Sequence, residues 1–482
     1  MRGTHRQPRQ LRFLAVSGLL LLSACGIDVG VAEPKDRTDV IIGGDPVTTT
    51  ASTAPATTLP PPDVPIKGDD GAEVNRVAAN AVADLQAFWT KTYPQVFGQP
   101  YQPIGGGFFA ADRNDNVSEL PCRPPSIQVV MNNAYYCPQD DAITWDQENL
   151  MPSLAAQYGD FVVAVVLAHE WGHAIQARAG TEFPTVVLEL QADCYAGAWS
   201  KHITTDADAR FKIDVGDIDS ALAGVLSLRD APGTESSDPN AHGSGFDRVG
   251  AFQEGYVKGA GRCKDFKPGD PQPFQFPFSA QEDQSGGDLY LDGADGINAL
   301  TFKSLDAYWA DTYPSISGGK PWKTMKAPVA FEPDAPPSCN GRTVTTYRLF
   351  LCVPERYVAY DEKETIPQAY ELGDFAVATL YATQYGLEVQ HDLGKDPADE
   401  VVATLRGDCY AGAWARALLP GNTKDAYQLT LSGGDLDEAM AVLLTFRTQS
   451  DRDRQGPGFG RARAFRIGVT EGVKPCVGLT AG

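Results

Sequence analysis

The chain has 482 residues, 43% of them hydrophobic, and a formal net charge of −22 at pH 7. This length predicts two or three domains, and the hydrophobic content is sufficient for their cores. The strong negative charge argues against electrostatic binding to nucleic acid or to anionic lipid head groups, so we expect neither kind of partner.

The N-terminus has the pattern of an export signal. A basic segment, Arg2–Arg12, is followed by an apolar run, Phe13–Leu22, that is too short for a membrane-spanning helix. Leu22-Ser-Ala-Cys25 then resembles a bacterial lipobox. This predicts a lipoprotein signal peptide at residues 1–24 and lipidation of Cys25; the alternative is an ordinary signal peptide with an incidental cysteine. We therefore expect an exported lipoprotein of the cell membrane that faces the extracytoplasmic side.

A flexible tether is predicted at residues 25–70. It is rich in Thr, Pro, Ala and Asp, and its run VTTTASTAPATTLPPP at Val47–Pro62 cannot form a core. The tether would hold the folded part of the protein away from the membrane.

Helices and short strands are mixed in the region that follows. Apolar residues at helical spacing predict an amphipathic helix at Val74–Thr92, and short strands are expected at Ser126–Asn132 and Ala142–Trp145. Two further helices are predicted at Asp160–Arg178, which is apolar on most sides, and at Pro184–His202. The predicted fold class is α+β.

An internal repeat determines the domain organisation. Several motifs return in the same order, such as DCYAGAW at Asp193–Trp199 and again at Asp408–Trp414. Two tandem domains are therefore expected, at residues 71–265 and 295–482. The linker between them, at residues 266–294, is rich in Pro, Gly, Gln and Asp.

The cysteines follow the repeat. The chain has nine cysteines, and the eight other than Cys25 are divided equally between the two predicted domains. An even number in each domain is expected for disulfides in an oxidising compartment. Four cysteines allow three pairings, and the simplest pairing joins neighbours in the sequence. It predicts the disulfides Cys122–Cys137, Cys194–Cys263, Cys339–Cys352 and Cys409–Cys476.

The first domain contains the motif His169-Glu-Trp-Gly-His173 in its apolar helix. Residues four positions apart lie on one face of a helix, so both imidazoles can bind the same metal ion. Glu170 is offset around the helix and can reach a water on that metal. The motif predicts one Zn²⁺ per chain, with His169 and His173 as ligands and Glu170 as the general base. The alternative is a pair of histidines that only pack the helix.

Zinc needs a third protein ligand. Glu189 and Asp193 lie on one face of the next predicted helix. This HExxH…ExxxD pattern resembles that of the gluzincins, and the resemblance implies that Glu189 is the third ligand. It also implies that Asp193 orients a ligand histidine.

The second copy serves as an internal control. Residues needed for folding should occur in both copies, whereas residues needed only for metal chemistry can be lost from one. Four positions differ while the flanking residues persist: Thr383, Gln384, Leu387 and Thr404 replace His169, Glu170, His173 and Glu189. This favours a functional role for the four residues and predicts a degenerate second domain without metal ligands. Asp193 persists as Asp408, so a purely structural hydrogen bond stays an alternative for it.

His242 is a further candidate, because Gln455 lies at its approximate counterpart. A histidine on a loop near the metal could stabilise the oxyanion of a tetrahedral intermediate. The alternative is a surface histidine. Arg248 recurs as Arg461 and is interpreted as structural.

These motifs and their surroundings resemble the neutral zinc metallopeptidases of bacteria. The segments that carry the resemblance are Cys137–Asp140, His169–Gln176, Glu189–Trp199, Gly216–Asp219 and His242–Arg248. The lipobox, the tether and the tandem form are similar to lipoprotein peptidases of mycobacteria and related actinobacteria. One departure is Leu228-Arg-Asp230, where a Gly-Asp-Asp run is expected.

The resemblance implies two zincin-like domains and an extracytoplasmic zinc metallopeptidase, with an endopeptidase as the expected type. Its substrates would be peptides or proteins, and the second domain could bind a protein partner. One alternative is a catalytically silent scaffold lipoprotein of the cell surface whose fold zinc stabilises. Another is a zinc amidase that acts on cell-wall peptides.

Overall fold

The computed structural model describes residues 6–7, 29–30, 62–230, 241–274, 287–446 and 449–481. Apart from two short strands, β1 (Arg6–Gln7) and β2 (Val29–Gly30), the predicted signal peptide and most of the predicted tether lie outside the described residues. Cys25 lies outside them as well. Its lipidation therefore stays a prediction.

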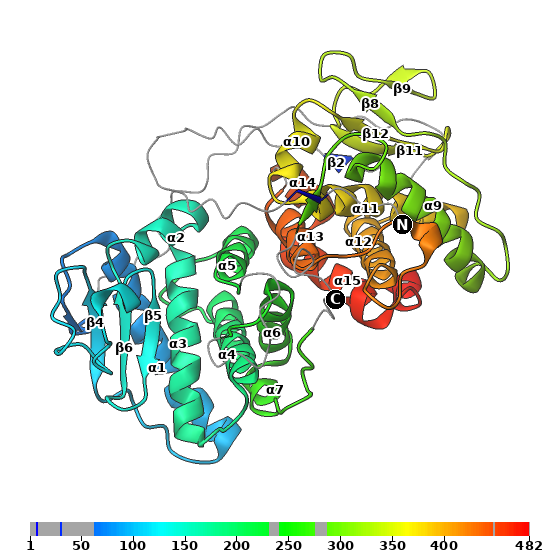
Figure 1. Cartoon of the computed structure of the whole chain (residues 1–482). Coiled ribbons are helices and arrows are strands. Elements are labelled where there is room, and N and C mark those ends of the chain that lie inside the picture. Colours follow the sequence, from blue (N-terminus) through cyan, green and yellow to red (C-terminus); the bar gives the residue numbers. More distant parts are fainter. Residues whose placement is uncertain are drawn as a thin grey trace. The chain divides into compact units, whose positions relative to one another are not determined.

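The chain divides into two compact units (Figure 1). The N-terminal unit comprises Ala51–Asp230 and Thr234–Gln275, and the C-terminal unit comprises Met1–Thr50, Ala231–Gly233 and Phe276–Gly482. Each contains helices and a small sheet, as the predicted α+β class requires.

The sheet of the N-terminal unit has the strand order β3-β4-β6-β5. Parallel pairing joins β4 to β3 and to β6, whereas β5 runs antiparallel to β6 and ends the sheet. The strands are β3 (Ile66–Lys67), β4 (Gly107–Ala111), β5 (Ala134–Cys137) and β6 (Ala142–Asp146). Because β3 pairs with β4, regular structure begins before residue 71, within the predicted tether.

The strand predicted at Ser126–Asn132 is wrong. A 3₁₀ helix, η1 (Ile127–Val129), occupies this segment, and the edge strand is β5 instead. Val130 is fully buried against Ala111, whereas its neighbour Val129 is half exposed. Ile127 and Val130, three residues apart, both pack into the core from one turn of helix. The sequence alone does not distinguish this spacing from the alternation of a strand.

The described residues of the N-terminal unit form seven helices. They are α1 (Glu73–Phe97), α2 (Leu150–Tyr158), α3 (Phe161–Ala179), α4 (Thr185–Thr205), α5 (Val215–Ser227), α6 (Gly245–Lys258) and α7 (Ala260–Lys264). The predicted helices near α1, α3 and α4 are confirmed. Of the seven, α3 and α2 contact the sheet. Helix α3 lies between the sheet and α4, and it ends at Gly180 in the left-handed conformation (φ 65°) (Figure 1).

The contact between α3 and α4 depends on a glycine. A Cβ at Gly172 would lie 2.7 Å from the Cα of Ala192, so no larger residue fits between the two backbones. In the C-terminal unit a Cβ at Gly386 would lie 2.7 Å from the Cα of Gly407. This close approach brings the helix with the histidine motif against the helix that carries Glu189.

The C-terminal unit has a sheet of order β2-β11-β12-β8, and β1 pairs with β7. Its strands after β2 are β7 (Asp288–Leu289), β8 (Val329–Phe331), β9 (Ser338–Cys339), β10 (Arg342–Thr343), β11 (Leu349–Cys352) and β12 (Tyr357–Asp361). Its helices are α9 (Ile297–Ile316), α10 (Thr365–Tyr370), α11 (Asp374–Asp392), α12 (Glu400–Ala417), η2 (Asp425–Tyr427), α13 (Asp435–Thr445), α14 (Gln449–Gln455), α15 (Gly458–Glu471) and η3 (Pro475–Gly478).

The disulfides are those predicted from the simplest pairing. Two lie in each unit: Cys122–Cys137, Cys194–Cys263, Cys339–Cys352 and Cys409–Cys476. The first disulfide of each unit includes the last residue of a sheet strand, β5 or β11. The second disulfide joins α4 or α12 to a later part of the same unit.

One ion pair has opposite polarity in the two units. In the N-terminal unit, Arg178 near the end of α3 contacts Asp141 in the β5–β6 turn at 2.9 Å. In the C-terminal unit, Arg356 in the β11–β12 turn contacts Asp392 at the end of α11 at 2.8 Å. Asp141 and Arg356 share a left-handed backbone, with φ of 49° and 55°. The turn and the helix end are thus held together in both units, with the charges exchanged.

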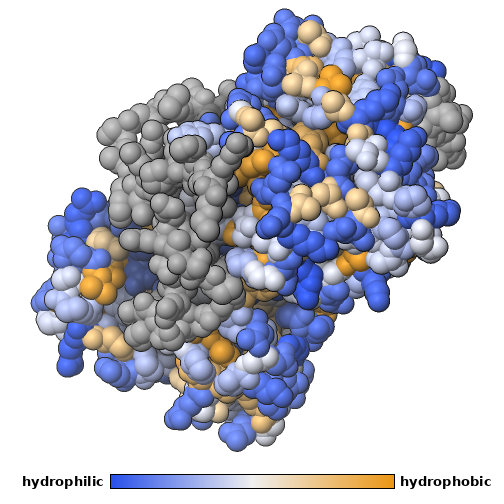
Figure 2. Space-filling model, turned by 45° about the vertical axis from the view of Figure 1, so that its right-hand side comes forward, coloured by the Kyte–Doolittle hydropathy of each residue, from blue (hydrophilic) through white to orange (hydrophobic). Residues whose placement is uncertain are grey.

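The described residues on the face seen in Figure 2 are largely hydrophilic. Hydrophobic residues form small groups among the hydrophilic ones on this face. Among the described residues, the large hydrophobic side chains that are exposed are Val129, Val215, Val257 and Tyr290. None of the described helices combines the length and the hydropathy that crossing a bilayer requires.

We predict that Gly172→Ala separates α3 from α4 and destabilises the protein by about 1–3 kcal/mol, because the added methyl group overpacks a closed contact. Thermal unfolding would measure the change. Gly261→Ala is the control, since a Cβ there meets no atom within 4 Å. Equal melting temperatures for the wild-type protein and Gly172→Ala would show that the close approach is not required.

Candidate metal centre

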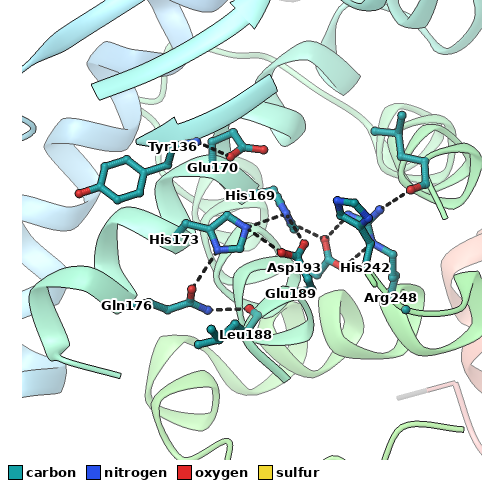
Figure 3. A network of polar contacts seen from close by, with 12 residues as sticks. Tyr136, His169, Glu170, His173, Gln176, Leu188, Glu189, Asp193, His242 and Arg248 are labelled. Atoms are coloured by element: carbon teal, nitrogen blue, oxygen red, sulfur yellow. Dashed lines mark hydrogen bonds and ion pairs between the residues drawn. The ribbon is translucent and has the colours of Figure 1, made fainter. Parts of the chain in front are cut away.

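The three predicted ligands lie together between α3 and α4 (Figure 3). The Nε2 atoms of His169 and His173 are 3.2 Å apart. Glu189 Oε2 is 3.2 Å from His169 Nε2, and Glu189 Oε1 is 3.4 Å from His173 Nε2. Two imidazole nitrogens and a carboxylate therefore converge on one point.

The other nitrogen of each imidazole faces an acceptor. His169 Nδ1 lies 2.7 Å from Asp193 Oδ1. His173 Nδ1 lies 2.9 Å from Gln176 Oε1, and the amide group of Gln176 donates to the carbonyl of Leu188 at 2.6 Å. Both Nδ1 atoms are therefore donors, so the Nε2 atoms of the neutral rings present lone pairs to each other and to Glu189.

These residues fit a zinc ion. Glu189 Oε2 is buried and accepts no hydrogen bond from the described residues. Lone pairs and a buried carboxylate that face one another without a donor are unfavourable, and a cation between them removes the repulsion. Two histidines and one glutamate, with a fourth position open, are the ligand set of catalytic zinc sites.

The charges around the centre favour a cation. Although burial opposes a charged imidazole, the carboxylates of Asp193 and Glu189 raise the pKa of His169 to about 10. Burial likewise opposes ionisation of Glu189, but the two histidines hold its pKa well below the usual value. The carboxylates thus create a negative potential at the Nε2 atoms that stabilises a proton or a metal ion there.

Glu170 lies beside this centre but does not join it. Its Oε2 accepts a hydrogen bond of 2.9 Å from the backbone N–H of Tyr136 in β5 (Figure 3). Burial raises the pKa of Glu170 above its ordinary value, and the neighbouring histidines act in the opposite direction. A carboxylate with a raised pKa is suited to accept a proton and return it near neutral pH.

Comparison with known proteins agrees with this geometry. The model of the family described as "Putative neutral zinc metallopeptidase" matches residues 38–266. This part of the chain is therefore similar to that family. The family implies a zinc ion and a peptidase, and His169, His173 and Glu189 of the metallopeptidase segment are the residues that can hold the ion.

Curated relatives cover the same part of the chain. The uncharacterized proteins Rv2575 of Mycobacterium tuberculosis and Mb2605 of Mycobacterium bovis are each 28% identical over 219 residues, which are 39% of this chain and 70% of theirs. The uncharacterized protein YpfJ of Escherichia coli is 28% identical over 158 residues, which are 27% of this chain and 53% of that protein. No solved structure matches the chain.

Asp193 makes both kinds of contact that the sequence left open. It faces His169, and it also forms a buried two-point ion pair with Arg248, with distances of 2.8 and 3.0 Å. In the C-terminal unit, Asp408 and Arg461 form the same pair at 2.8 Å for both contacts. The carboxylate of the metallopeptidase segment therefore stabilises the packing of α4 on α6 and orients a ligand histidine.

The C-terminal unit has a counterpart of Gln176 but none of His173. Gln390 lies where Gln176 lies in the N-terminal unit, and its amide group donates to the carbonyl of Ala403 at 2.9 Å. Its buried Oε1 accepts no hydrogen bond from the described residues, because Leu387 stands in place of His173. The support for a histidine thus persists where the histidine does not.

His242 lies on the loop before α6, beside Glu189 and Arg248 (Figure 3). Its Nδ1 is 3.3 Å from Asp230 Oδ1, and its side chain is 52% exposed. Sequence reasoning missed Asp230 as a site residue. The only signal was the departure of Leu228–Asp230 from the expected run, which pointed to the segment without giving it a role.

We predict that the purified protein binds about one zinc ion per chain and that His173→Ala loses it, because the remaining histidine and glutamate leave the site incomplete. Metal analysis after dialysis would measure the zinc content. His202→Ala is the matched control, since His202 lies in α4 and pairs with Asp206 at the surface. Retention of zinc by His173→Ala would contradict the assigned ligand set.

Proposed function

We propose that this chain is a zinc-dependent endopeptidase whose active site is formed by His169, His173, Glu189 and Glu170. The observation that supports this best is the buried Glu170, which lies beside three ligand groups without being one of them. A zinc site that serves only the fold has four protein ligands and needs no general base. A bound zinc ion would lower the pKa of its water to about 7 and polarise a carbonyl oxygen.

The protein residues would share the remaining work. Glu170 takes a proton from the attacking water and delivers it to the nitrogen of the leaving amine. The backbone N–H of Tyr136 holds the Glu170 carboxylate in place during both transfers. His242 donates a hydrogen bond to the oxyanion that forms at the scissile carbonyl.

We assign substrate alignment to β5. This strand ends the sheet, and the N–H of Tyr136 points from it towards Glu170. The outer edge of β5 can pair with the backbone of an extended peptide, which favours a polypeptide substrate. The same geometry argues against the cell-wall amidase alternative, because main-chain pairing requires several consecutive peptide groups.

A non-catalytic role is proposed for the C-terminal unit. Thr383, Gln384 and Thr404 offer no metal ligand of the usual kind at the positions of His169, Glu170 and Glu189. The unit is suited to recognise a substrate or a protein partner. A wholly silent scaffold protein is the second candidate function, and it is favoured only by this loss in one of the two units.

We also propose that the protein is exported and lipid-anchored at Cys25, on the extracytoplasmic side of the membrane. The supporting observations are the lipobox pattern and the four disulfides of the described residues. These bonds persist in oxidising compartments.

We predict that Glu170→Gln retains zinc but slows the hydrolysis of dye-labelled casein by about 10²–10⁴-fold, because the amide cannot accept the proton. Release of dye-labelled fragments would measure the rate. Glu182→Gln is the control, since it removes an exposed carboxylate from the same unit. Undiminished hydrolysis by Glu170→Gln would refute the assignment of the base.

We predict that Cys25→Ser abolishes incorporation of labelled palmitate and moves the protein from the membrane fraction to the soluble exported fraction. The reason is that the serine hydroxyl does not replace the thiol in lipid transfer. Lipid labelling and fractionation of bacterial cells that express the full chain would test this. Continued labelling of the serine variant would exclude Cys25 as the anchor.

A further inference from the structure

Asp230 contacts both the backbone of the loop that carries His242 and the imidazole ring of His242. Its Oδ2 accepts hydrogen bonds from the N–H groups of His242 and Gly243, at 2.8 and 2.7 Å. Its Oδ1 lies 3.3 Å from His242 Nδ1, and its own N–H donates to the carbonyl of Gly243. A single carboxylate therefore fixes where the loop passes and how the imidazole is turned.

The same loop lies against the helix that supplies the third metal ligand. The position of a Cβ on Gly243 is 3.6 Å from Val186 and 3.7 Å from Leu190, both in α4. Glu189 lies between these two residues in the sequence, and its charge acts on His242. His242 thus lies beside Glu189 (Figure 3), with its Nδ1 directed towards Asp230.

The exposed edge of the ring is available to a substrate. The side chain of His242 is 52% exposed, and within the described residues its Nε2 makes no hydrogen bond. A hydrogen bond from Nδ1 to a carboxylate leaves Nε2 as the nitrogen that faces outwards. The Asp230 contact also raises the pKa of His242 against the effect of burial.

The C-terminal unit lacks both members of this pair. Phe446-Arg-Thr448 stands where the N-terminal unit has Leu228-Arg-Asp230, so the arginine is retained and the aspartate is lost. Gln455, near the counterpart of His242, is buried and accepts a hydrogen bond from Arg461 at 3.0 Å. In the N-terminal unit, Arg248 donates from the same nitrogen to the carbonyl of Leu228, which leaves His242 free of the arginine. The C-terminal unit therefore lacks the aspartate and the histidine together, and it also lacks counterparts of His169, His173 and Glu189.

We propose that Asp230 is a positioning residue that acts through His242, holding the imidazole with Nδ1 protonated and Nε2 directed to the substrate at the metal centre. This inference rests on the proposed peptidase function, in which His242 contacts the oxyanion.

The test combines spectroscopy with kinetics. Long-range ¹H–¹⁵N spectra of the zinc-loaded full chain, labelled in its six histidines, give the protonation state of each ring nitrogen, and His242→Gln assigns the signals. We expect a protonated Nδ1 for His242 in the wild-type protein and a changed ring signal in Asp230→Asn. An unprotonated Nδ1 in the wild-type protein would overturn the proposal without any variant at position 230.

Kinetics on dye-labelled casein test whether Asp230 acts through His242. Asp230→Asn keeps an acceptor for the two backbone N–H groups but loses the charge, so we expect kcat to fall by about 10–100-fold while KM stays unchanged. In a His242→Gln background the same change should cause no further loss. An equal loss in both backgrounds would show that Asp230 acts independently and would overturn the proposal.

The controls separate this proposal from the proposed function. Asp214→Asn is the matched control, because Asp214 also accepts two backbone N–H groups, at the other end of α5. Asparagine caps a helix as well as aspartate does, so no effect is expected there. If the wild-type protein and Glu170→Gln hydrolyse casein equally, the peptidase function fails, whereas the spectra still decide whether Asp230 sets the state of His242.

Discussion

The close approach of α3 to α4 is the constraint on which the metal centre depends. The histidine motif supplies two ligands from one helix, but a third ligand must come from a neighbouring backbone at a fixed distance. Gly172 permits that distance, because any side chain there would meet Ala192. The same contact recurs at Gly386 in the C-terminal unit, where Thr383, Leu387 and Thr404 stand at the positions of His169, His173 and Glu189. The close packing of the two helices therefore does not depend on those three side chains. The proposed metal ligands therefore lie on a helix contact that both units share.

The ion pair of Asp193 with Arg248 links packing to chemistry. A buried carboxylate needs a partner, and the guanidinium provides two parallel hydrogen bonds. With its charge compensated in this way, Asp193 can also accept a hydrogen bond from His169 and fix its tautomer. In the C-terminal unit the equivalent pair of Asp408 with Arg461 is present, although Thr383 stands in place of His169. Comparison of the two units therefore separates groups that build the fold from groups that use it.

The sequence was sufficient for features that depend on short spacing. Residues four apart on a helix must share a face, so the pairing of His169 with His173 follows from their spacing alone. Tertiary contacts were harder to predict. The edge strand was placed too early because apolar residues at 127 and 130 suit a strand or a turn equally well. Asp230 was missed because its partner, His242, lies twelve residues away in the sequence, too far for a contact to follow from local spacing.

The exchanged polarity of the Arg178–Asp141 and Arg356–Asp392 pairs has a consequence for a chain that carries two similar sequences in tandem. Such chains are prone to misassembly, in which a segment of one copy docks into the other during folding. If the β11–β12 hairpin took the place of the β5–β6 hairpin, Arg356 would meet Arg178, and the reverse exchange would bring Asp141 against Asp392. Each incorrect combination would bring together two side chains of like charge that are partly or mostly buried. Each correct combination forms an ion pair. Charge reversal at this one position thus allows two copies of a fold to share a backbone design and still recognise their own hairpins.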